Sequence, residues 1–326
     1  FPLMILLIGL SNLIVIWVGG IQYMNGEIEI GILAEFIIYV NMLTWPVTVL
    51  GWLTSIVQQA EASQKRINEF LKESPNIKDG NSKTKISDGK IEFKKVSLVY
   101  PETKIKALNR VSLTVNAGET VGLIGLVGSG KTSLFELITR LYDPTNGEVL
   151  IDDKNLKFYM LNNIRENIGY VPQNSFLFSE SIYNNIKFGK NNATKDEIKN
   201  AANIACIHNE IIKLKDGYDT ILGERGITLS GGQVQRISIA RALIKNPLII
   251  LLDDCLSAVD TKTEEKILKN INKFYENKTK LIISHRVTSI KSANNILVFK
   301  DGSLIEFGNH KKLLSNKGYY NDLYCK

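Results

Sequence analysis

Residues 229–233 read Leu-Ser-Gly-Gly-Gln, and after a short helical stretch the apolar run 248–252 ends in Asp253. Well upstream, residues 125–132 read Gly-Leu-Val-Gly-Ser-Gly-Lys-Thr. This upstream stretch matches GxxxxGK[ST], the pattern of a loop that binds the phosphates of a nucleotide. The phosphate loop alone indicates only nucleotide binding. The segment 229–233, placed between that loop and the acidic strand end, narrows the fold to one class of P-loop ATPase.

The phosphate loop lies between a predicted buried strand, residues 119–124, and residues 133–138, which have helical spacing. Glycines let backbone N–H groups converge on phosphate oxygens, and the following helix N-terminus favours an anion. We expect Lys131 to reach the β- and γ-phosphates of ATP, and Thr132 to ligate Mg²⁺ through its hydroxyl. The other residues of this segment that we expect to bind ATP are Gly125, Gly128, Ser129, Gly130 and Ser133. A chance glycine-rich turn does not account for the full GxxxxGK[ST] pattern between a predicted strand and a predicted helix.

Length and charge limit the remaining possibilities. A chain of 326 residues is long for one domain and suggests about two. The net charge of +7 does not predict nucleic-acid binding, because the apolar N-terminal segment concentrates the charge elsewhere and no aromatic-plus-basic motif is present. A basic surface near anionic lipid is the simpler interpretation. The widely spaced Cys206, Cys255 and Cys325 predict neither a disulfide framework nor a metal site.

The N-terminal region has the pattern of a membrane hairpin. Residues 1–26 and 36–60 carry no charged side chain, and each is long enough to cross a hydrocarbon core of about 30 Å. The short polar segment 25–31 between the spans holds two acids and no base, and several lysines follow the second span, so the chain from Glu61 onward is predicted to face the cytoplasm. A pair of buried core helices remains the alternative, given Asn12, Asn41 and Pro46. Because the chain starts inside an apolar run, we expect a longer protein that supplies further membrane helices.

The sequence therefore divides into three parts. Residues 1–72 form the membrane helices and their helical extension, residues 73–90 a polar linker, and residues 91–326 a globular domain. The domain opens with a strand that alternates apolar and polar residues, typical of an antiparallel flank with one wet face. Six further strands are predicted, at residues 121–125, 147–151, 168–171, 248–252, 281–283 and 295–299. The fold class is an all-α transmembrane segment followed by an α/β P-loop NTPase domain with an antiparallel β flank.

The order of the motifs resembles the ATP-binding cassette (ABC) proteins. The resemblance covers essentially the whole chain and implies a helical subdomain that carries the signature LSGGQ at residues 229–233. In that family the signature contacts ATP held by the opposite subunit, and a D-loop, here at residues 257–260, crosses to the partner. The residues that this comparison assigns to the partner's ATP are Ser230, Gly231, Gly232 and Gln233, with Asp260 in the D-loop. A serine hydroxyl and backbone amides that open a helix suit an oxyanion.

Three more positions carry the resemblance. Tyr100, just before Pro101, is similar to the aromatic platform on which ABC proteins stack adenine, although an ordinary strand tyrosine is the alternative. Gln173 resembles the Q-loop glutamine that approaches Mg²⁺, and His285 resembles the switch histidine that contacts the γ-phosphate. The resemblance assigns catalysis to Asp254, His285 and Gln173, and Mg²⁺ binding to Thr132, Gln173 and Asp253.

The stretch Gly-Glu-Arg-Gly at residues 223–226 is typical of ABC exporters. Together with the upstream helices it implies an exporter half-transporter, similar to the MdlA-like, multidrug-resistance-like branch. The implied function is ATP-driven export of multidrug or lipid-like, small amphipathic substrates. The implied partner is a second half-transporter, within the lipid bilayer of a bacterial plasma (inner) membrane, with the nucleotide-binding domain cytoplasmic.

Asp254 departs from the family pattern, which has glutamate after the metal-holding aspartate. Aspartate keeps the charge but is one methylene shorter, and a general base must lie about 2.6–3.2 Å from the attacking water. A misplacement near 1 Å costs about a hundredfold in rate. We therefore expect an impaired ATP site that operates in a heterodimer, with a fully active conservative replacement as the alternative.

Two alternatives to this function remain open. The first is a homodimeric lipid or peptide exporter, and the second is a soluble ABC ATPase that acts on nucleic acid or ribosomes. The membrane hairpin and the Gly-Glu-Arg-Gly stretch favour an exporter over the soluble ATPase.

Overall fold

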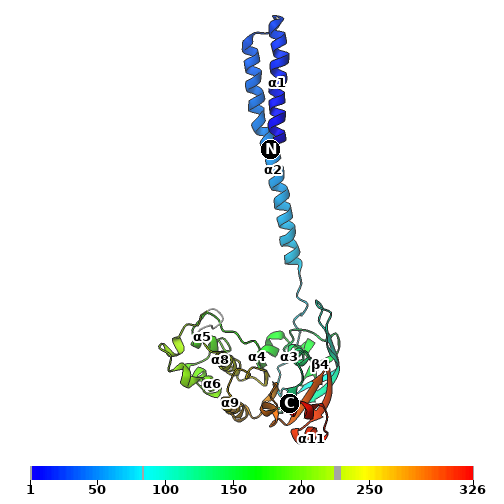
Figure 1. Ribbon diagram of the computed structural model, residues 1–326, viewed down its shortest axis with the longest axis vertical. Helices are drawn as coiled ribbons and strands as arrows, with labels where there is room; N and C mark the ends of the chain where they lie inside the picture. The colour runs from blue at the N-terminus through cyan, green and yellow to red at the C-terminus, as the bar shows by residue number, and fades with distance from the viewer. Residues whose placement is uncertain (1, 83, 224–228, 326) are drawn as a thin grey trace. The chain divides into compact units, whose positions relative to one another are not determined.

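The computed structural model describes residues 2–82, 84–223 and 229–325. The chain forms two compact units, Phe1–Asn76 and Ile77–Lys326, which are described separately. Figure 1 shows the course of the chain through both.

The first unit is a helical hairpin made of α1 (Pro2–Met24) and α2 (Ile30–Lys72). Both helices are long and apolar enough to cross a membrane, and almost none of their apolar windows is buried inside the structure. Large side chains such as Trp17 and Trp45 are more than 70% exposed. A pair of core helices in a soluble protein would bury such residues, so the exposure favours contact with lipid. α2 also runs on through the predicted cytoplasmic extension to Lys72.

The second unit is built on a six-stranded sheet in the order β10-β9-β3-β8-β7-β6. Five neighbouring strands are parallel and β10 is an antiparallel edge strand. The strands are β3 (Thr120–Ile124), β6 (Ile168–Val171), β7 (Ile249–Asp253), β8 (Thr279–Ile283), β9 (Asn295–Lys300) and β10 (Ser303–Gly308).

The apolar runs of the parallel strands are explained by burial on both faces of this sheet. In β7, Ile250 and Leu252 pack into one core, whereas Ile249 and Leu251 pack into the core on the opposite face. Parallel strands end at one edge of a sheet, so the loop after β3 and the acidic end of β7 meet there.

A smaller antiparallel sheet, in the order β2-β1-β4-β5, flanks the first. Its inward residues share a core with one face of the large sheet. Its strands are β1 (Ile91–Val99), β2 (Lys106–Val115), β4 (Asn146–Ile151) and β5 (Lys154–Asn155). The expected antiparallel flank is therefore present.

Helices α5, α6 and α8 lie together in a helical lobe, away from β4 (Figure 1). The helices on the phosphate-loop side are α3 (Lys131–Ile138) and α4 (Leu161–Asn167). The helical lobe contains α5 (Ile182–Lys187), α6 (Lys195–Ile204), α7 (His208–Ile211) and α8 (Gly231–Leu243). The remaining helices are α9 (Thr261–Phe274), α10 (Val287–Ile290), α11 (His310–Ser315) and α12 (Tyr319–Tyr324), with 3₁₀ turns at Leu156–Phe158 and Gly217–Asp219.

The last part of the segment expected as a linker is tied to the second unit. The Asp152 carboxylate accepts the backbone N–H groups of four successive residues, 87–90, at 2.8–3.1 Å. One carboxylate thus satisfies four backbone donors at the entrance to β1.

Candidate nucleotide-binding site

A cavity of about 250 Å³ opens where the parallel strands end. It brings together residues from the phosphate loop, from the turn between β1 and β2 and the start of β2, from the end of β7, and from the loops after β6, β7 and β8. The expected site residues that line it are Tyr100, Gly128, Ser129, Gly130, Lys131, Thr132, Ser133, Gln173, Asp253, Asp254 and His285. Segments separated by up to 185 positions in the sequence therefore meet in one place.

Glycine is required at two points of the phosphate loop. Gly130, with φ 95°, caps α3, and a Cβ atom there would lie 2.5 Å from the carbonyl oxygen of Ala107. Gly125 does not line the cavity. A Cβ atom on it would lie 2.3 Å from the Phe299 carbonyl oxygen, so this glycine allows the loop to pass close to β9.

The ammonium group of Lys131 is held by the loop itself. Its Nζ donates to the carbonyl oxygens of Gly125 and Leu126, each at 2.9 Å, and to Ser129 Oγ at 3.3 Å. Burial lowers the pKa of Lys131, and the negative charges of Asp253 and Asp254 oppose that shift. The ammonium group therefore lies near the N-terminus of α3. The helix dipole favours phosphate oxygens at this end of the helix.

Asp253 has the properties of a group that holds a metal ion. It is 2% exposed, and its Oδ2 atom has no hydrogen-bond partner among the described residues. Burial raises the pKa of Asp253, while the neighbouring Thr132 hydroxyl and Lys131 oppose the rise. The described residues contain no group of three His, Cys, Asp or Glu side chains suited to a metal. An ion here would thus take further ligands from phosphates and water, as Mg²⁺ does.

Tyr100 lines the cavity and is also tied to α3. Its hydroxyl lies 2.7 Å from Ser133 Oγ and donates to Glu136 Oε2 at 2.5 Å. Its ring packs edge-on against Tyr142, with centroids 5.0 Å apart. Burial, reinforced by the bond to Glu136, raises the pKa of Tyr100 to about 12. The tyrosine is therefore neutral and held by both its ring and its hydroxyl.

Asp254 and His285 lie beside each other at the ends of β7 and β8. Asp254 Oδ2 is 3.9 Å from His285 Nε2, and the His285 backbone N–H points to Asp254 Oδ1 at 3.4 Å. The Asp254 backbone is in the left-handed region, with φ 44°, which aspartate tolerates better than most residues. Its N–H donates to the Ile283 carbonyl at 2.9 Å, which fixes the turn.

The signature residues 229–233 lie at the start of α8 and do not line this cavity. Ser230 is exposed and caps the helix, accepting the Gln233 backbone N–H at 3.3 Å. Gly232 is buried and lies close to the D-loop: a Cβ atom on it would lie 2.8 Å from the Ala258 carbonyl oxygen.

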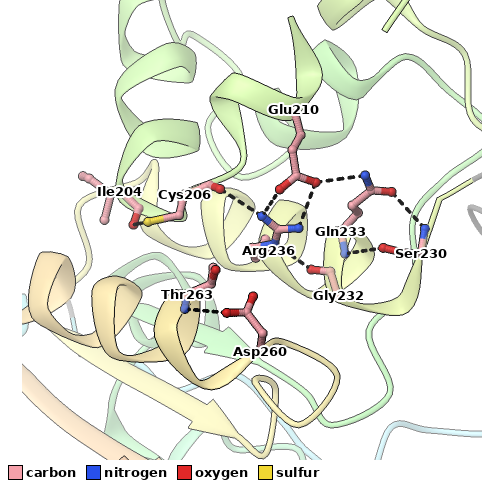
Figure 2. A network of polar contacts seen from close by, with 9 residues as sticks. All are labelled: Ile204, Cys206, Glu210, Ser230, Gly232, Gln233, Arg236, Asp260 and Thr263. Atoms are coloured by element: carbon pink, nitrogen blue, oxygen red, sulfur yellow. Dashed lines mark hydrogen bonds and ion pairs between the residues drawn. The ribbon is translucent and has the colours of Figure 1, made fainter. Parts of the chain in front are cut away.

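Asp260 caps α9, accepting the Thr263 N–H at 3.0 Å (Figure 2). The exporter-type stretch Gly-Glu-Arg-Gly begins at Gly223, but residues 224–228 lie outside the described residues.

Several polar residues that hold these loops were not predicted from the sequence. Gln235 on α8 donates to Ser257 Oγ at 3.3 Å and accepts the Ala258 N–H at 3.1 Å, so it fastens the D-loop. Arg286, next to the switch histidine, donates to Glu264 Oε2 at 2.9 Å. The adjacency of Gln235 to the signature was the only local signal, and no motif marked the other contacts.

Comparisons with known proteins identify similar chains. The family model for the ABC transporter matches residues 108–257. An uncharacterized ABC transporter ATP-binding protein of Bacillus subtilis, YfiB, is 44% identical over 324 residues, which is 99% of this chain and 56% of YfiB. The multidrug resistance-like ATP-binding protein MdlA of Escherichia coli is 38% identical over 99% of this chain and 55% of MdlA.

Among solved structures, a bacterial Atm1-family ABC exporter with ATP bound matches with a TM-score of 0.85 and 32% identity. The match covers 99% of this chain and 57% of the exporter chain. The chain therefore spans about half the length of the relatives it matches.

Proposed function

This chain belongs to the ABC transporter family, and we propose that it supplies the nucleotide-binding domain and two membrane helices of one half of an ATP-driven exporter. The observation that carries the proposal is the single cavity that unites the phosphate loop, Gln173, the acidic end of β7 and His285. In the same chain, two helices are long and apolar enough to cross a membrane.

ATP binding is assigned to the phosphate loop and Tyr100. The phosphate loop, Lys131 and Tyr100 all line the cavity. Backbone amides of the loop and the Lys131 ammonium would bind the phosphates, and the Tyr100 ring would stack on the adenine. Thr132, Gln173 and Asp253 would hold Mg²⁺, which neutralises charge on the phosphates when bound. His285 would contact the γ-phosphate, and Asp254 would accept a proton from the attacking water.

The signature residues require a second domain. Ser230 and Gly231 are exposed and do not line the cavity, so they are free to meet a nucleotide held by another subunit. Each ATP would then lie between the cavity of one domain and the signature of the other. A dimer of half-transporters satisfies this arrangement, and closing it would move the attached membrane helices.

We propose a heterodimer in which this chain's own ATP site is impaired. The short carboxylate of Asp254 carries that part of the proposal. The capping box formed by Ser230 and Gln233 is intact. This supports the proposal that the signature of this chain serves the partner's site. The proposed substrate is a small amphipathic or lipid-like molecule, in keeping with the multidrug resistance-like name of MdlA. The proposed location is the plasma membrane of a bacterium.

The test uses the full-length protein, co-purified with its partner and reconstituted in lipid vesicles. We expect ATP and Mg²⁺ together to drive movement of a fluorescent amphipathic dye, and Lys131→Ala to abolish nucleotide binding at this chain's site. ATPase activity without dye movement would contradict the substrate class. Stimulation by nucleic acid, with recovery in the soluble fraction after an alkaline carbonate wash, would contradict the exporter.

A further inference from the structure

The start of α8 is closed by a reciprocal pair of hydrogen bonds (Figure 2). The Gln233 backbone N–H donates to Ser230 Oγ at 3.3 Å, and the Ser230 N–H donates to Gln233 Oε1 at 2.9 Å. The serine oxygen thus accepts from inside the helix, and its hydroxyl hydrogen is left to donate outward. The second of these bonds, from the Ser230 backbone N–H, depends on which way the Gln233 side-chain amide points.

Glu210 on α7 determines that direction. Its Oε2 accepts the Gln233 Nε2–H at 3.0 Å, so the amide nitrogen faces the acid and the amide oxygen faces Ser230. A carboxylate accepts and cannot donate, so the reverse orientation of the amide would set two acceptors against each other.

Arg236 holds Glu210 in place. Its Nη1 and Nη2 atoms bind the two carboxylate oxygens at 2.5 and 3.0 Å, a bidentate pair. The same guanidinium donates to the carbonyl oxygens of Gly232 at 3.1 Å and Cys206 at 3.0 Å. Its side chain is 10% exposed, so the pair is shielded from solvent screening on that side. The bond to Arg236 also lowers the pKa of Glu210 and keeps it an acceptor at neutral pH.

We propose that Glu210 is a positioning residue for the signature. Through the Gln233 side chain it holds the Ser230 backbone N–H, and with it the cap in which the Ser230 hydroxyl accepts the Gln233 N–H. Through Arg236 it fixes the Gly232 peptide, so that the hydroxyl and the peptide face the phosphates of the partner's ATP. This inference rests on the proposed function, in which the signature acts across the dimer. Glu210 itself does not line the nucleotide cavity of its own chain.

If the Glu210–Arg236 ion pair had only a structural role, its loss would have a different outcome from the loss of a positioning residue. Losing a structural pair would lower the melting temperature and all activities together. Losing a positioning acceptor should lower turnover while this chain's own site still binds ATP. A lost hydrogen bond to a charged group corresponds to about a 10- to 100-fold change.

The experiment compares variants in the full-length transporter, with fluorescent ATP analogue titration, steady-state ATPase and thermal melting. We expect Glu210→Ala to lower turnover about tenfold or more, with the analogue's affinity at this chain's site changed less than about twofold. The matched control is Glu197→Ala, which removes a similar ion pair and a capping box from α6 without touching the signature. It should keep wild-type turnover.

An exchange of donor and acceptor provides the rescue. Gln233→Glu and Glu210→Gln should each be impaired, whereas the double variant restores one donor and one acceptor between the two positions and should recover turnover relative to both. Wild-type turnover in Glu210→Ala, or a parallel loss of analogue affinity and melting temperature without rescue, overturns the inference.

Ser230→Arg separates this inference from the function on which it rests. It places a bulky cation where the partner's phosphate should approach. If Ser230→Arg abolishes turnover and Glu210→Ala does not, only the role of Glu210 is wrong. If Ser230→Arg also leaves turnover unchanged, the signature does not act across subunits and both proposals fail.

Discussion

Tyr100 faces the cavity with its ring and binds α3 with its hydroxyl, so its two functions can be separated by substitution. Tyr100→Phe keeps the ring for adenine. It removes the hydroxyl that binds Ser133 and Glu136, so we expect stability to fall by about 1–3 kcal/mol with nearly unchanged ATP affinity. Tyr100→Ala also removes the stacking surface and should weaken ATP binding by roughly 1–3 kcal/mol.

Nucleotide titration and thermal melting of the two variants decide between these contributions. Equal loss of ATP affinity in both would mean that the hydroxyl contact, and not the ring, determines binding.

For single residues, the sequence predicts those that belong to contiguous motifs. Lys131 and Thr132 follow a glycine-rich loop, and Asp253 ends an apolar strand, so local pattern alone placed them in the cavity. Glu210 contacts Arg236 across 26 positions, and no local pattern marks either residue. Such contacts depend on how α7 packs against α8, which periodicity does not reveal.

Between elements, α8 packs directly against the D-loop, and a pair of adjacent glycines tests that contact. A Cβ atom on Gly232 would lie 2.8 Å from the Ala258 backbone oxygen, whereas one on Gly231 would meet only the Ala258 Cβ at 3.5 Å. We expect Gly232→Ala to displace the D-loop and to lower both the melting temperature and ATPase activity. Gly231→Ala, at an ordinary contact distance, should leave the melting temperature unchanged or raise it slightly.

Equal melting temperatures for the two variants would show that the D-loop moves aside without cost. The signature and the D-loop would then be mechanically independent.

A buried carboxylate joins α9 to α10. Glu264 is 3% exposed. Its Oε2 atom accepts a hydrogen bond from Arg286 Nη1 at 2.9 Å, and its Oε1 atom accepts one from the Ser289 hydroxyl. Glu264→Ala leaves both donors without a partner, and because Arg286 is about half exposed we expect a moderate loss of about 1–3 kcal/mol. Chemical denaturation measures it, with Glu265→Ala, an exposed neighbour on the same helix, as the control. A loss no larger than that of the control would contradict the assignment.

The strands that are buried on both faces of the large sheet could be predicted from the sequence. The apolar runs of β3, β6, β7, β8 and β9 matched their strands to within about two residues, because parallel strands in this domain are covered on both faces. β2 and β10 were not predicted. β2 carries exposed residues and register shifts against β1, and β10 is a partly exposed edge strand. β2 alternates regularly only over residues 111–115, and β10 shows no regular alternation.

For the whole molecule, the signature lies outside the nucleotide cavity of its own chain, and in the proposed dimer two domains would share each ATP. The substitution at Asp254 would then make the two shared sites unequal. The signature of this chain would serve the partner's site, while its own cavity would hold ATP with a carboxylate that is too short. Aspartate at φ 44° beside His285 keeps the charge of the site but not the reach.

The last prediction compares Asp254→Glu with Asp254→Asn in the assembled heterodimer. Asp254→Glu should raise hydrolysis at this chain's own site, because the longer side chain can bring its oxygen within about 3 Å of the attacking water. Asp254→Asn should change total ATPase little, because in the proposed heterodimer the competent base would lie in the partner. Steady-state ATPase is measured for each variant beside the partner's Glu→Gln control, which should remove most of the turnover. If Asp254→Asn instead removes about half or more of the turnover, as expected for two equivalent sites with one base each, aspartate is a working base here. The alternative of a homodimeric exporter would then be favoured.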